Sequence, residues 1–534
     1  MSNLAPKPVT LVYKPETNVI GIDLGTTNIV CALHRAGDEK AEVLPFNDGK
    51  RIMPSIVEFD ETGCCESYGS NKNGRPVYVL PNGYEILPEK VSTELLKIVK
   101  KTAGEKIEGG KITDCVITVP AYFSMEQKQA TQEAARDAGL NVLSLMTEPV
   151  AAAYAYGFDH PKYDGFTLFV FDLGGGTFDV TIIKYENGQF VTKCTDGDNN
   201  LGGRDFDNAL FEYVKQRFTP LALKVPRASK IEEQTRGLMN SISYICNRAV
   251  KNACIESCDI DKVLLIGGAS RMKIIKDLVR DIFPNQIKTE KGGASADEAV
   301  AVGAAIRAAQ LRDPKHKNIK NYIDALPIGV GIGLIENQYS IMVNRGTHFP
   351  TTVVKQYFTS RNNQEVVHIV IYEGERLLAD RNRKLGEFYL TGLPKGPAGQ
   401  VSIDVTFKFD QNGILTVLAS SKSGSQESFT INYKEQRDQG EPIEDLIRQF
   451  ESCRIDDEGK QIIAHARAKL IQNIEHIRSR IDSSLPDEER KKLMNMCNNA
   501  DQLLKRETDH TLISEKIENL EYEAKKILKN LYYS

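Results

Sequence analysis

The segment Phe169–Ile183 reads FVFDLGGGTFDVTII, and it decides the fold. Its apolar first part predicts one β-strand, and the alternation of apolar and polar residues after position 177 predicts a second. The three glycines between the strands predict a turn, so we expect a β-hairpin. Glycine tolerates φ > 0 and carries no Cβ, which lets several backbone N–H groups converge on one anion. This hairpin is therefore a candidate phosphate-binding turn.

Oxygen-bearing side chains stand beside the predicted turn. Asp172 precedes it, Thr177 closes it, and Asp179 follows in the second strand. Carboxylates beside a phosphate-binding turn suit Mg²⁺, which prefers oxygen ligands and keeps most of its waters. Taken alone, the motif leaves open an ordinary glycine-rich hairpin that binds no ligand.

The motif occurs a second time in the chain. Val19–Leu33 reads VIGIDLGTTNIVCAL and aligns with Leu168–Ile182. The aligned positions are Asp23 with Asp172, Gly25 with Gly174, and Thr26 and Thr27 with Gly175 and Gly176. Two matching hairpins predict two lobes from a duplicated unit, with a nucleotide between them. A P-loop and a dinucleotide-binding turn do not fit, because neither GxxxxGKS nor GxxxxGKT occurs and a strand, not a helix, follows the glycines.

Length and composition set the class of protein. The 534 residues predict several domains, and the net charge of −4 gives no reason to expect nucleic acid binding. The ten cysteines are scattered without paired CxxC spacing, which argues against a metal site and fits a reducing compartment. No apolar run approaches the roughly 18 residues of a membrane helix. We expect a soluble protein of the cytoplasm or nucleus, with no nucleic acid or membrane partner.

Other segments of the first 312 residues alternate between strand and helix patterns. A strand from Cys115 ends at Pro120, and Ser124 with Gln127 forms a capping box that opens a helix. Glu148 follows another strand, where it is either a charge at a helix N-terminus or, if it faces the hairpin turns, a candidate general base. Lys72 lies in a stretch rich in Gly, Asn and Pro that predicts a loop, where a lysine is ordinarily a solvated surface charge.

Two further glycine turns precede predicted helices. One is NNLGGRDF at residues 199–206, and the other is GGASR at residues 267–271, after the strand VLLI. A strand, a glycine pair and a helix N-terminus can hold a phosphate or a sugar, although any tight connection of this kind also favours glycine. Asp297 then opens a helix of small residues that ends near Gln310.

The remaining chain changes pattern twice. Residues 313–326 form a polar interval, and alternating strands follow to about residue 433, with an Asn-Gly hairpin turn at 412–413. From residue 441 onward the apolar spacing is helical. By themselves these patterns predict only a β-sandwich and a small helical bundle, either of which can be purely structural.

A family resemblance joins these parts. The motifs IDLGTTN, VITVPAYF, EPVAAAYAYG, DLGGGTFDV, LGGRDFD, LIGGASR and ADEAVAVGAA occur in this order. They resemble the nucleotide-binding domain of the heat-shock protein 70 (Hsp70) chaperone family, within the actin and sugar-kinase superfamily. YEGER, TGLPKGPAG and FDQNGIL resemble the peptide-binding sandwich of the same family.

The resemblance implies a multidomain α/β + β + α fold. The expected parts are an actin-like two-lobed ATPase domain at 1–312 with lobes at about 18–145 and 146–310, a linker at 313–326, a β-sandwich substrate-binding domain at 327–435, and a helical lid bundle at 436–534. The implied function is an ATP-dependent chaperone that binds extended, unfolded polypeptide segments and hydrolyses ATP to ADP and phosphate. Its cofactors would be ATP or ADP with Mg²⁺, and its partners a J-domain co-chaperone and a nucleotide exchange factor.

The resemblance also implies site residues. The expected catalytic residues are Lys72, Glu148, Asp172, Thr177 and Asp179, and Asp23 and Asp172 would hold Mg²⁺ through water. The ATP-binding set is Gly25, Thr26, Thr27, Gly174, Gly175, Gly176, Thr177, Gly202, Gly203, Gly268, Ser270, Arg271 and Asp297. The peptide groove would be lined by Ile332, Ile335, Tyr357, Val367, Ile369 and Ile414. Pro120, Lys128 and Asp324 would relay nucleotide state between domains.

The sequence departs from the family pattern at several points. The interval between LGGRDFD and LIGGASR is about half the family length, which removes residues expected to face adenine opposite Arg271 and shortens the usual docking subdomain of exchange factors. Arg204 stands where an acid is common, and Lys128 where an arginine is usual. Two alternatives follow: a non-hydrolysing or weakly nucleotide-binding relative that acts as a peptide-binding or regulatory protein, and a small-molecule kinase of the same superfamily.

Overall fold

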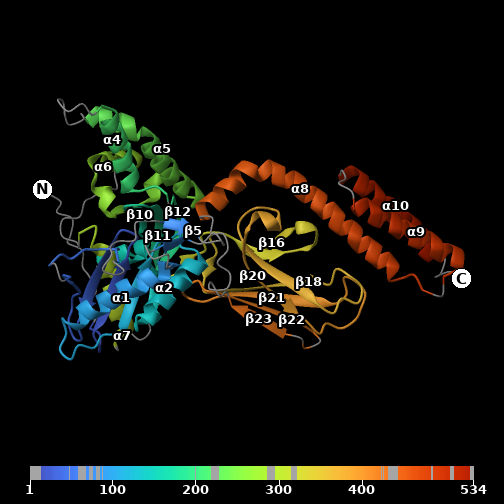
Figure 1. Ribbon diagram of the computed structural model, residues 1–534, viewed down its shortest axis with the longest axis horizontal. Coiled ribbons are helices and arrows are strands. Elements are labelled where there is room, and N and C mark those ends of the chain that lie inside the picture. Colours follow the sequence, from blue (N-terminus) through green and yellow to red (C-terminus); the bar gives the residue numbers. More distant parts are fainter. Residues whose placement is uncertain are drawn as a thin grey trace.

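The computed structural model describes residues 14–46, 49–57, 68–70, 76–79, 85–86, 88–198, 200–217, 228–284, 295–313, 315, 322–422, 424, 426–430, 443–482, 485–505 and 510–529. An α/β part with two sheets lies at one end, a β-sandwich follows, and a long helix arches over the sandwich toward the C-terminus (Figure 1). The described residues contain no helix that is long and apolar enough to cross a bilayer.

The first sheet carries the N-terminal hairpin. Its strands are β1 (Val19–Leu24), β2 (Asn28–His34), β3 (Glu42–Val43), β4 (Met53–Pro54), β8 (Asp114–Val119) and β9 (Asn141–Thr147). Their order is β3-β2-β1-β8-β9, with β4 paired to β2; β1 and β2 are antiparallel, whereas β8 is parallel to β1. Helices α1 (Pro88–Gly104) and α2 (Met125–Asp137) pack on one face through residues such as Leu96 and Ala135.

The second sheet repeats this arrangement. Its strands are β10 (Thr167–Leu173), β11 (Phe178–Glu186), β12 (Gln189–Asp198) and β13 (Lys262–Ile266), in the order β12-β11-β10-β13. The pair β10 and β11 is antiparallel and β13 is parallel to β10, as β8 is to β1. Its outer face is covered by α4 (Gly203–Arg217), α5 (Ala228–Asn252) and α6 (Lys273–Ile282). Both predicted hairpins are confirmed, and the shared strand order supports a duplicated unit.

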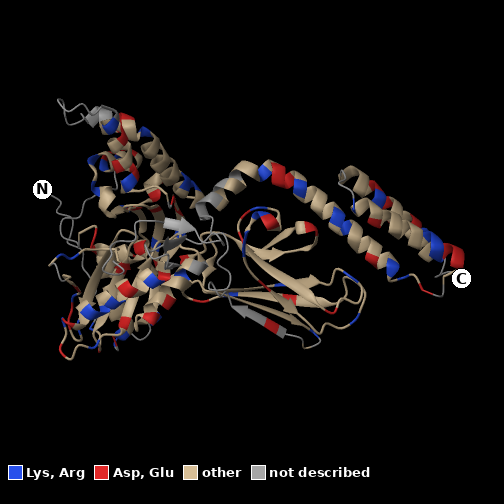
Figure 2. Cartoon of the chain, in the orientation of Figure 1, with Lys and Arg blue, Asp and Glu red and all other residues tan. Residues whose placement is uncertain are grey.

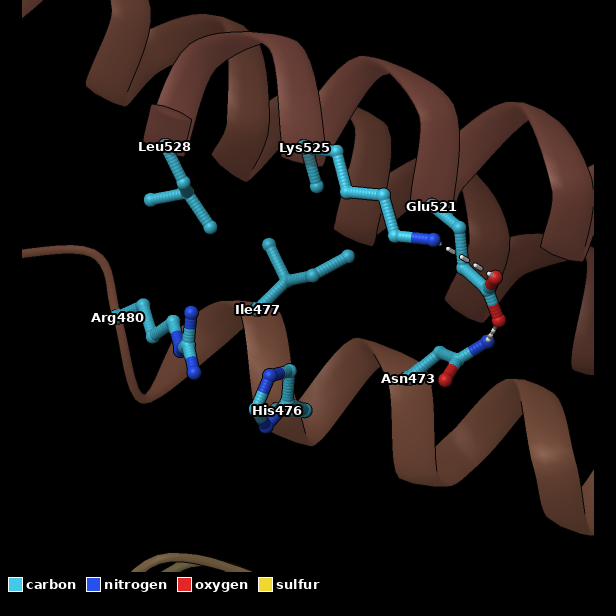
Figure 3. A pocket seen from close by; sticks show the side chains of 8 residues that line it. Asn473, His476, Ile477, Arg480, Glu521, Lys525 and Leu528 are labelled. Atoms are coloured by element: carbon cyan, nitrogen blue, oxygen red, sulfur yellow. Dashed lines mark hydrogen bonds and ion pairs between the residues drawn. The ribbon is translucent and has the colours of Figure 1, made fainter. Parts of the chain in front are cut away.

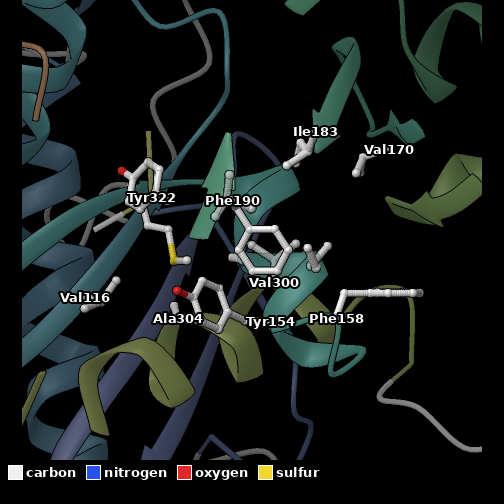
Figure 4. Close-up of a cluster of buried hydrophobic side chains, with 14 of the residues drawn as sticks. Val116, Tyr154, Phe158, Val170, Ile183, Phe190, Val300, Ala304 and Tyr322 are labelled. Carbon is white, nitrogen blue, oxygen red and sulfur yellow. The ribbon is translucent and has the colours of Figure 1, made fainter. Parts of the chain in front are cut away.

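Two helices of small residues join the two sheets. They are α3 (Glu148–Ala155) and α7 (Ala299–Arg312), which share one buried cluster with strands of both sheets. Figure 4 shows Val116 from the first sheet, Val170 from the second, and Tyr154 and Ala304 from the two helices in this cluster. Alanine and glycine allow the close approach: a Cβ on Gly303 would lie 1.8 Å from the Ala151 carbonyl oxygen.

This contact gives a prediction about stability. Gly303→Ala is expected to lower the free energy of unfolding by at least about 1–3 kcal/mol, because α3 and α7 must move apart. The matched control is Gly237→Ala in α5, where an added Cβ meets no atom within 4 Å; there the change should raise stability by about 0.5–1 kcal/mol. Denaturant unfolding followed by circular dichroism measures both, and an unchanged midpoint for Gly303→Ala would contradict the packing.

The stretch around Lys72 differs in part from the expected loop. It contains three short strands, β5 (Tyr68–Ser70), β6 (Pro76–Val79) and β7 (Glu85–Ile86), which form an antiparallel sheet. The prediction was wrong for these residues because β6 alternates Val77 and Val79 with Tyr78, a β-favouring pattern that the surrounding turn residues obscured. Lys72 itself lies outside the described residues.

The β-sandwich contains two four-stranded antiparallel sheets. One has the order β16 (Tyr339–Val343), β15 (Val330–Gly333), β19 (Val367–Glu373), β20 (Arg383–Leu390). The other has the order β18 (Thr351–Phe358), β21 (Ser402–Phe409), β22 (Leu415–Ser421), β23 (Gln426–Thr430). The Asn-Gly hairpin is confirmed, because β21 pairs with β22 and Gly413 has φ +76°. Alternating side chains from both sheets fill the core.

Three helices complete the chain. They are α8 (Ile443–Arg478), α9 (Asp487–Leu504) and α10 (His510–Lys529), which share an apolar cluster that includes Leu470, Leu493 and Leu520. Pro486 occupies the N-cap position of α9. Lys and Arg residues are interspersed with Asp and Glu along these helices (Figure 2). Helix α8 is tied to the sandwich below it by ion pairs from Arg376 to Asp457 and from Arg467 to Glu336.

The end of the predicted linker is an ordered part of the joint between the α/β part and the sandwich. Tyr322 is buried in the cluster between the two sheets, and its hydroxyl donates to the Leu145 carbonyl at 2.6 Å. Ile323 donates to the Phe190 carbonyl at 2.7 Å and accepts from the Thr192 amide at 2.9 Å, so it extends the edge of β12. Strand β14 (Asp324–Ala325) then pairs with β17 (His348–Phe349) of the sandwich part.

Candidate functional site

The two glycine hairpins meet at one cleft between the sheets. A Cβ on Gly175 would lie 2.6 Å from the Thr27 hydroxyl oxygen, so the turn of one hairpin lies against the turn of the other. The cleft between them is lined by most of the predicted phosphate and metal residues: Asp23, Gly25, Thr26, Thr27, Glu148, Asp172, Gly174, Gly175, Gly176, Thr177, Gly268 and Asp297, together with Pro120. The duplication thus brings residues about 150 positions apart to one place.

The backbone of the second hairpin leaves its amides available to a ligand. The carbonyls of Gly174 and Gly175 accept from the amides of Gly203 and Arg204, each at 2.9 Å. No acceptor in the described part of the chain is recorded for the amides of Gly175 and Gly176. Backbone amides that border a cleft without a protein acceptor can donate to an anion there. The arrangement therefore suits a phosphate group.

The second glycine pair supports this turn from behind. A Cβ on Gly202 would lie 2.5 Å from the Gly176 backbone, so only glycine allows this approach. Gly202 and Gly203, which were expected in the ATP-binding set, are not among the residues that line the cleft. Their position beneath the phosphate turn follows from the hydrogen bonds of α4 to the hairpin carbonyls. The sequence motif indicated that glycine is needed at position 202, but it did not indicate that the Gly176 backbone is the segment it contacts.

The strand-to-helix turn after β13 contributes a further residue, Gly268, to the lining of the cleft. It forms a short 3-10 helix, η3 (Gly268–Arg271), in which the buried Ser270 hydroxyl donates to the Gly267 carbonyl at 2.7 Å. Arg271 forms an ion pair with Asp297, at the start of the segment leading to α7. Gly268 and Asp297 line the cleft. Ser270 and Arg271 are not lining residues, but they contact Gly267 and Asp297, which are.

Three carboxyl groups gather at the base of the cleft: Glu148 is buried, and Asp23 and Asp172 are half-buried. Burial, followed by the charge of Asp172, raises the pKa of Asp23 to about 7, and burial raises the pKa of Asp172 to about 6. The pKa of Glu148 is raised well above its usual value, first by burial and then by the charges of Asp172 and Asp23. A hydrogen bond from Glu148 partly offsets the shift of Asp172. Such a cluster is stabilised by a bound cation.

The donor set fits a hydrated Mg²⁺. The described residues contain no group of three or more His, Cys, Asp or Glu side chains placed to ligate a metal directly. A Mg²⁺ ion that keeps its waters and shares phosphate oxygens needs no such group, only nearby carboxylates. Asp23 and Asp172 line the cleft and supply that negative charge, and the Thr118 hydroxyl donates to Asp23 at 3.4 Å.

Asp179 lies next to this cluster rather than in the cleft lining. It pairs with Asp172 across the hairpin, and its charge contributes to the raised pKa of Glu148. A Cβ on Gly197 of β12 would lie 2.9 Å from the Asp179 carboxylate, so the carboxylate lies at the β12 side. Of the expected catalytic residues, the structure brings Glu148, Asp172 and Thr177 together at the cleft, with Asp179 behind them.

The three predicted relay residues connect the cleft to the sandwich. Pro120 lines the cleft, and Lys128 lies on α2, which begins shortly after it. The Lys128 ammonium lies 3.9 Å from the Asp324 carboxylate and 5.1 Å from the centre of the Phe349 ring. Both charged side chains are only 5% exposed. This set of contacts also includes Phe349, next to the sandwich, which the sequence did not indicate.

Other contacts across the same joint were also missed. Arg345 donates to the Tyr122 hydroxyl at 3.1 Å, and His348 lies 2.7 Å from the Thr192 carbonyl. Tyr122 also packs with Leu446 and with residues 328 and 447, which joins the start of α8 to the first lobe. These residues lie in turns and at element ends, where no periodic pattern marks them.

Four of the six predicted groove residues lie in or against the sandwich core. Ile332 and Ile369 are buried in the sandwich core, and Tyr357 and Val367 pack against it. Tyr357 lies near Ile332, because its hydroxyl is 2.8 Å from that of Ser340, which pairs with Ile332.

The other two groove residues lie elsewhere. Ile335 is in the short helix η5 (Ile335–Asn337), beside the Arg467 contact of α8. Ile414 follows the turn that begins after Phe409, whereas Tyr357 pairs with Ile403, so about 20 Å of β21 separates them. The tight hairpin turn places Ile414 at the end near α2.

A separate cavity lies in the helical bundle. It is lined by Asn473, His476, Ile477, Arg480, Glu521, Ala524, Lys525 and Leu528, between α8 and α10. Figure 3 shows Ile477 and Leu528 pointing into it, with Asn473 and Lys525 both joined to Glu521. It contains none of the glycine turns or acid clusters of the cleft and was not indicated by the sequence.

The fold and the cleft define a class before any comparison. A duplicated pair of phosphate hairpins closes on clustered carboxylates, and this nucleotide-binding part is joined to a β-sandwich under a helical segment. This is the architecture of an ATPase domain coupled to a substrate-binding domain.

The comparisons with known proteins give the family. The family model described as "Hsp70 protein" matches residues 19–70, 68–222 and 219–533. "Chaperone protein DnaK" of Deinococcus proteolyticus is 31% identical over 581 residues, covering 92% of this chain and 91% of that protein. The proteins of the same name from Deinococcus deserti and Deinococcus radiodurans are 32% and 34% identical, covering 81% and 77% of this chain and 82% and 78% of their own lengths. The chain belongs to the Hsp70 family, and is a chaperone ATPase of the Hsp70 type.

Proposed function

We propose that this chain binds extended, unfolded polypeptide segments in its β-sandwich and releases them under control of ATP binding and hydrolysis in the cleft. The observation that carries the proposal is the meeting of two glycine turns over three clustered carboxyl groups, of which Glu148 is buried and Asp23 and Asp172 are half-buried. Cations and phosphates are the ligands that this combination of free amides and carboxylates favours.

The hydrolysis of ATP to ADP and phosphate is assigned to residues of the cleft. Thr26, Thr27 and the three glycines of the second turn would hold the phosphates. Glu148 and Thr177 would orient the attacking water, with Asp179 behind them and Lys72 near the terminal phosphate. Mg²⁺, held through its waters by Asp23 and Asp172, would supply charge that offsets the triphosphate. Catalysis of this kind is mainly positioning and charge stabilisation.

The nucleotide-dependent control of release is assigned to the joint. Pro120 borders the cleft, Lys128 contacts both Asp324 and Phe349, and Ile323 extends β12, the strand next to the phosphate hairpin. A movement of either lobe on binding ATP therefore acts on the segment that leads into the sandwich. Separate apolar clusters at 19–322, 326–419 and 470–527 support the proposed division into an actin-like two-lobed ATPase domain, a sandwich and a helical lid.

Peptide binding is proposed on the sandwich below α8. One buried apolar side chain contributes about 1.5–3 kcal/mol, and each of a few backbone hydrogen bonds about 0.5–1.5 kcal/mol. After the cost of ordering the peptide, we expect affinity near micromolar. Such affinity allows release, which a chaperone requires.

A substitution in β19 tests the groove. Val367→Phe is expected to weaken binding of an extended apolar peptide at least tenfold, because the larger ring fills the space for the peptide side chain. The control is Val370→Phe in the same strand, whose side chain lies on the opposite face from Ile369 and Ile371. Fluorescence anisotropy of a labelled peptide measures both, and equal affinity of Val367→Phe and the unchanged protein would remove the groove assignment.

The partners and location are part of the proposal. A J-domain co-chaperone would stimulate hydrolysis, and a nucleotide exchange factor would bind despite the shortened interval between α4 and β13. Location in the cytoplasm stays a prediction.

The family assignment favours an ATPase over the non-hydrolysing alternative, and the sandwich and helical lid argue against a small-molecule kinase.

One experiment tests the proposed function as a whole. The purified chain is incubated with labelled peptide and Mg²⁺, first with ADP and then with ATP, while peptide release and phosphate production are followed together. We expect ATP to accelerate release and a J-domain protein to increase phosphate production. A chain whose peptide complex and calorimetric signal are both indifferent to ATP would contradict the proposal.

A further inference from the structure

Arg204 occupies an unusual position at the phosphate hairpin. It is the second residue of α4, and its amide is fixed to the Gly175 carbonyl at 2.9 Å. Its side-chain Nε donates to the same carbonyl at 3.3 Å, and its Nη2 lies 2.6 Å from the place that a Cβ on Gly176 would occupy. The guanidinium thus lies directly against the turn whose glycines line the cleft.

No carboxylate neutralises this arginine in the part of the chain that the structure describes. Its one recorded side-chain contact is with a backbone carbonyl, although the guanidinium has five N–H donors. The neighbouring acid, Asp205, is turned away and accepts from the Gly202 amide at 2.7 Å. An exposed cation beside free backbone amides can therefore add its remaining donors to an anion in the cleft.

The arginine reaches the turn at Gly176. Its Nη2, the far end of a flexible side chain, lies 2.6 Å from the place of a Cβ there, which puts the positive charge next to this part of the turn. An arginine suits this place because its planar fork matches two oxygens of one phosphate group. An acid at position 204, which the resemblance gives as common, would place a negative charge at the same point.

We infer that Arg204 is a phosphate-binding residue that favours a nucleotide with a terminal γ-phosphate over ADP. This inference rests on the proposed function, since it assumes that nucleotide binds in the cleft. The guanidinium lies against the turn formed by Gly175 and Gly176, next to the cleft but outside the residues that line it. It would add charge where a terminal phosphate meets the second lobe, whereas ADP lacks the group that it would contact.

The test compares two nucleotides across matched variants. Arg204→Glu and Arg204→Gln are prepared with Arg236→Glu, an exposed arginine of α5, as the charge-matched control. Calorimetry in Mg²⁺ gives Kd for a non-hydrolysable ATP analogue and for ADP. We expect Arg204→Glu to weaken the analogue about ten- to a hundredfold, and Arg204→Gln somewhat less, with a change for ADP of under about threefold. Arg236→Glu should change neither value.

A second measurement follows the affinity for the ATP analogue as the salt concentration is raised. Affinity of the unchanged protein for the analogue should fall more steeply with ionic strength than that of Arg204→Gln, because one exposed charge has been removed. Equal effects on the analogue and ADP, or no effect on either, would overturn the inference while the proposed function stands. If the unchanged protein binds neither nucleotide, both fail. Arg204→Gln preserves the side-chain size and serves if the acidic variant does not fold.

Discussion

Replacing Asp172 with asparagine is expected to lower the rate of ATP hydrolysis by about 10²- to 10³-fold while nucleotide binding remains measurable. Asp172 ends β10, lines the cleft beside the glycine turn and accepts a hydrogen bond from Glu148. Asparagine keeps the shape but removes one of the two charges assigned to hydrated Mg²⁺. Single-turnover phosphate release measures the rate, and calorimetry measures the binding.

A matched substitution distinguishes this effect from a general loss of structure. Asp164→Asn removes an exposed charge at the other end of the same hairpin and should leave hydrolysis unchanged. The folded state of Asp172→Asn should also gain stability without nucleotide, because burial raises the pKa of Asp172 and so disfavours its charged form. A variant that is more stable yet nearly inactive would mark a catalytic residue. Unchanged turnover would contradict the assignment.

The local parts of the site could be predicted because each is encoded over a few residues. The alternation around 174–176 specifies a hairpin, and the repeat of the pattern around Asp23 specifies its partner. Ser124 and Gln127 form the predicted capping box with bonds of 3.2 and 2.8 Å. In each case, the residues that determine the geometry are neighbours in sequence.

The parts that the sequence did not predict depend on contacts between distant segments. Gly202 was expected at the sugar or base, but its partner is the Gly176 backbone, which only the docking of α4 on the hairpin determines. Ile414 was expected in the groove, but the register of β21 and β22 places it near α2 instead. Alternation in a strand gives the face of a side chain but not its position along the sheet.

The joint between the domains contains contacts that the sequence predicted and contacts that it did not. The resemblance indicated Lys128 and Asp324, and the structure places them 3.9 Å apart. It did not indicate Phe349, whose ring lies 5.1 Å from the Lys128 ammonium, because an aromatic residue before a proline carries no local sign of an interdomain contact. The polar interval expected as a linker, residues 313–326, contains Tyr322, which is buried between the two sheets.

Lys128→Ala is expected to separate the sandwich from the α/β part and to uncouple peptide release from ATP. Burial raises the pKa of Asp324, and the Lys128 charge opposes that shift. Removing one partner of a buried ion pair costs about 3–5 kcal/mol, which is a change of about 10²-fold to about 5 × 10³-fold in an equilibrium constant. Because the pair joins α2 to the segment entering the sandwich, this cost falls on the docked arrangement.

Hydrogen exchange at Ile323 reports this equilibrium directly, since its amide donates to Phe190 only when the segment is docked. Exchange should accelerate in Lys128→Ala and stay unchanged in Arg136→Ala, whose ion pair with Glu133 on the same helix is 70% exposed at the arginine and contributes at most about 1 kcal/mol. Lys128→Met should accelerate exchange as Lys128→Ala does. The double variant Lys128→Met with Asp324→Asn should regain part of the protection of the Ile323 amide, because no charge is then left buried alone. Exchange at Ile323 that is the same with and without Lys128 would show that the joint does not depend on this pair.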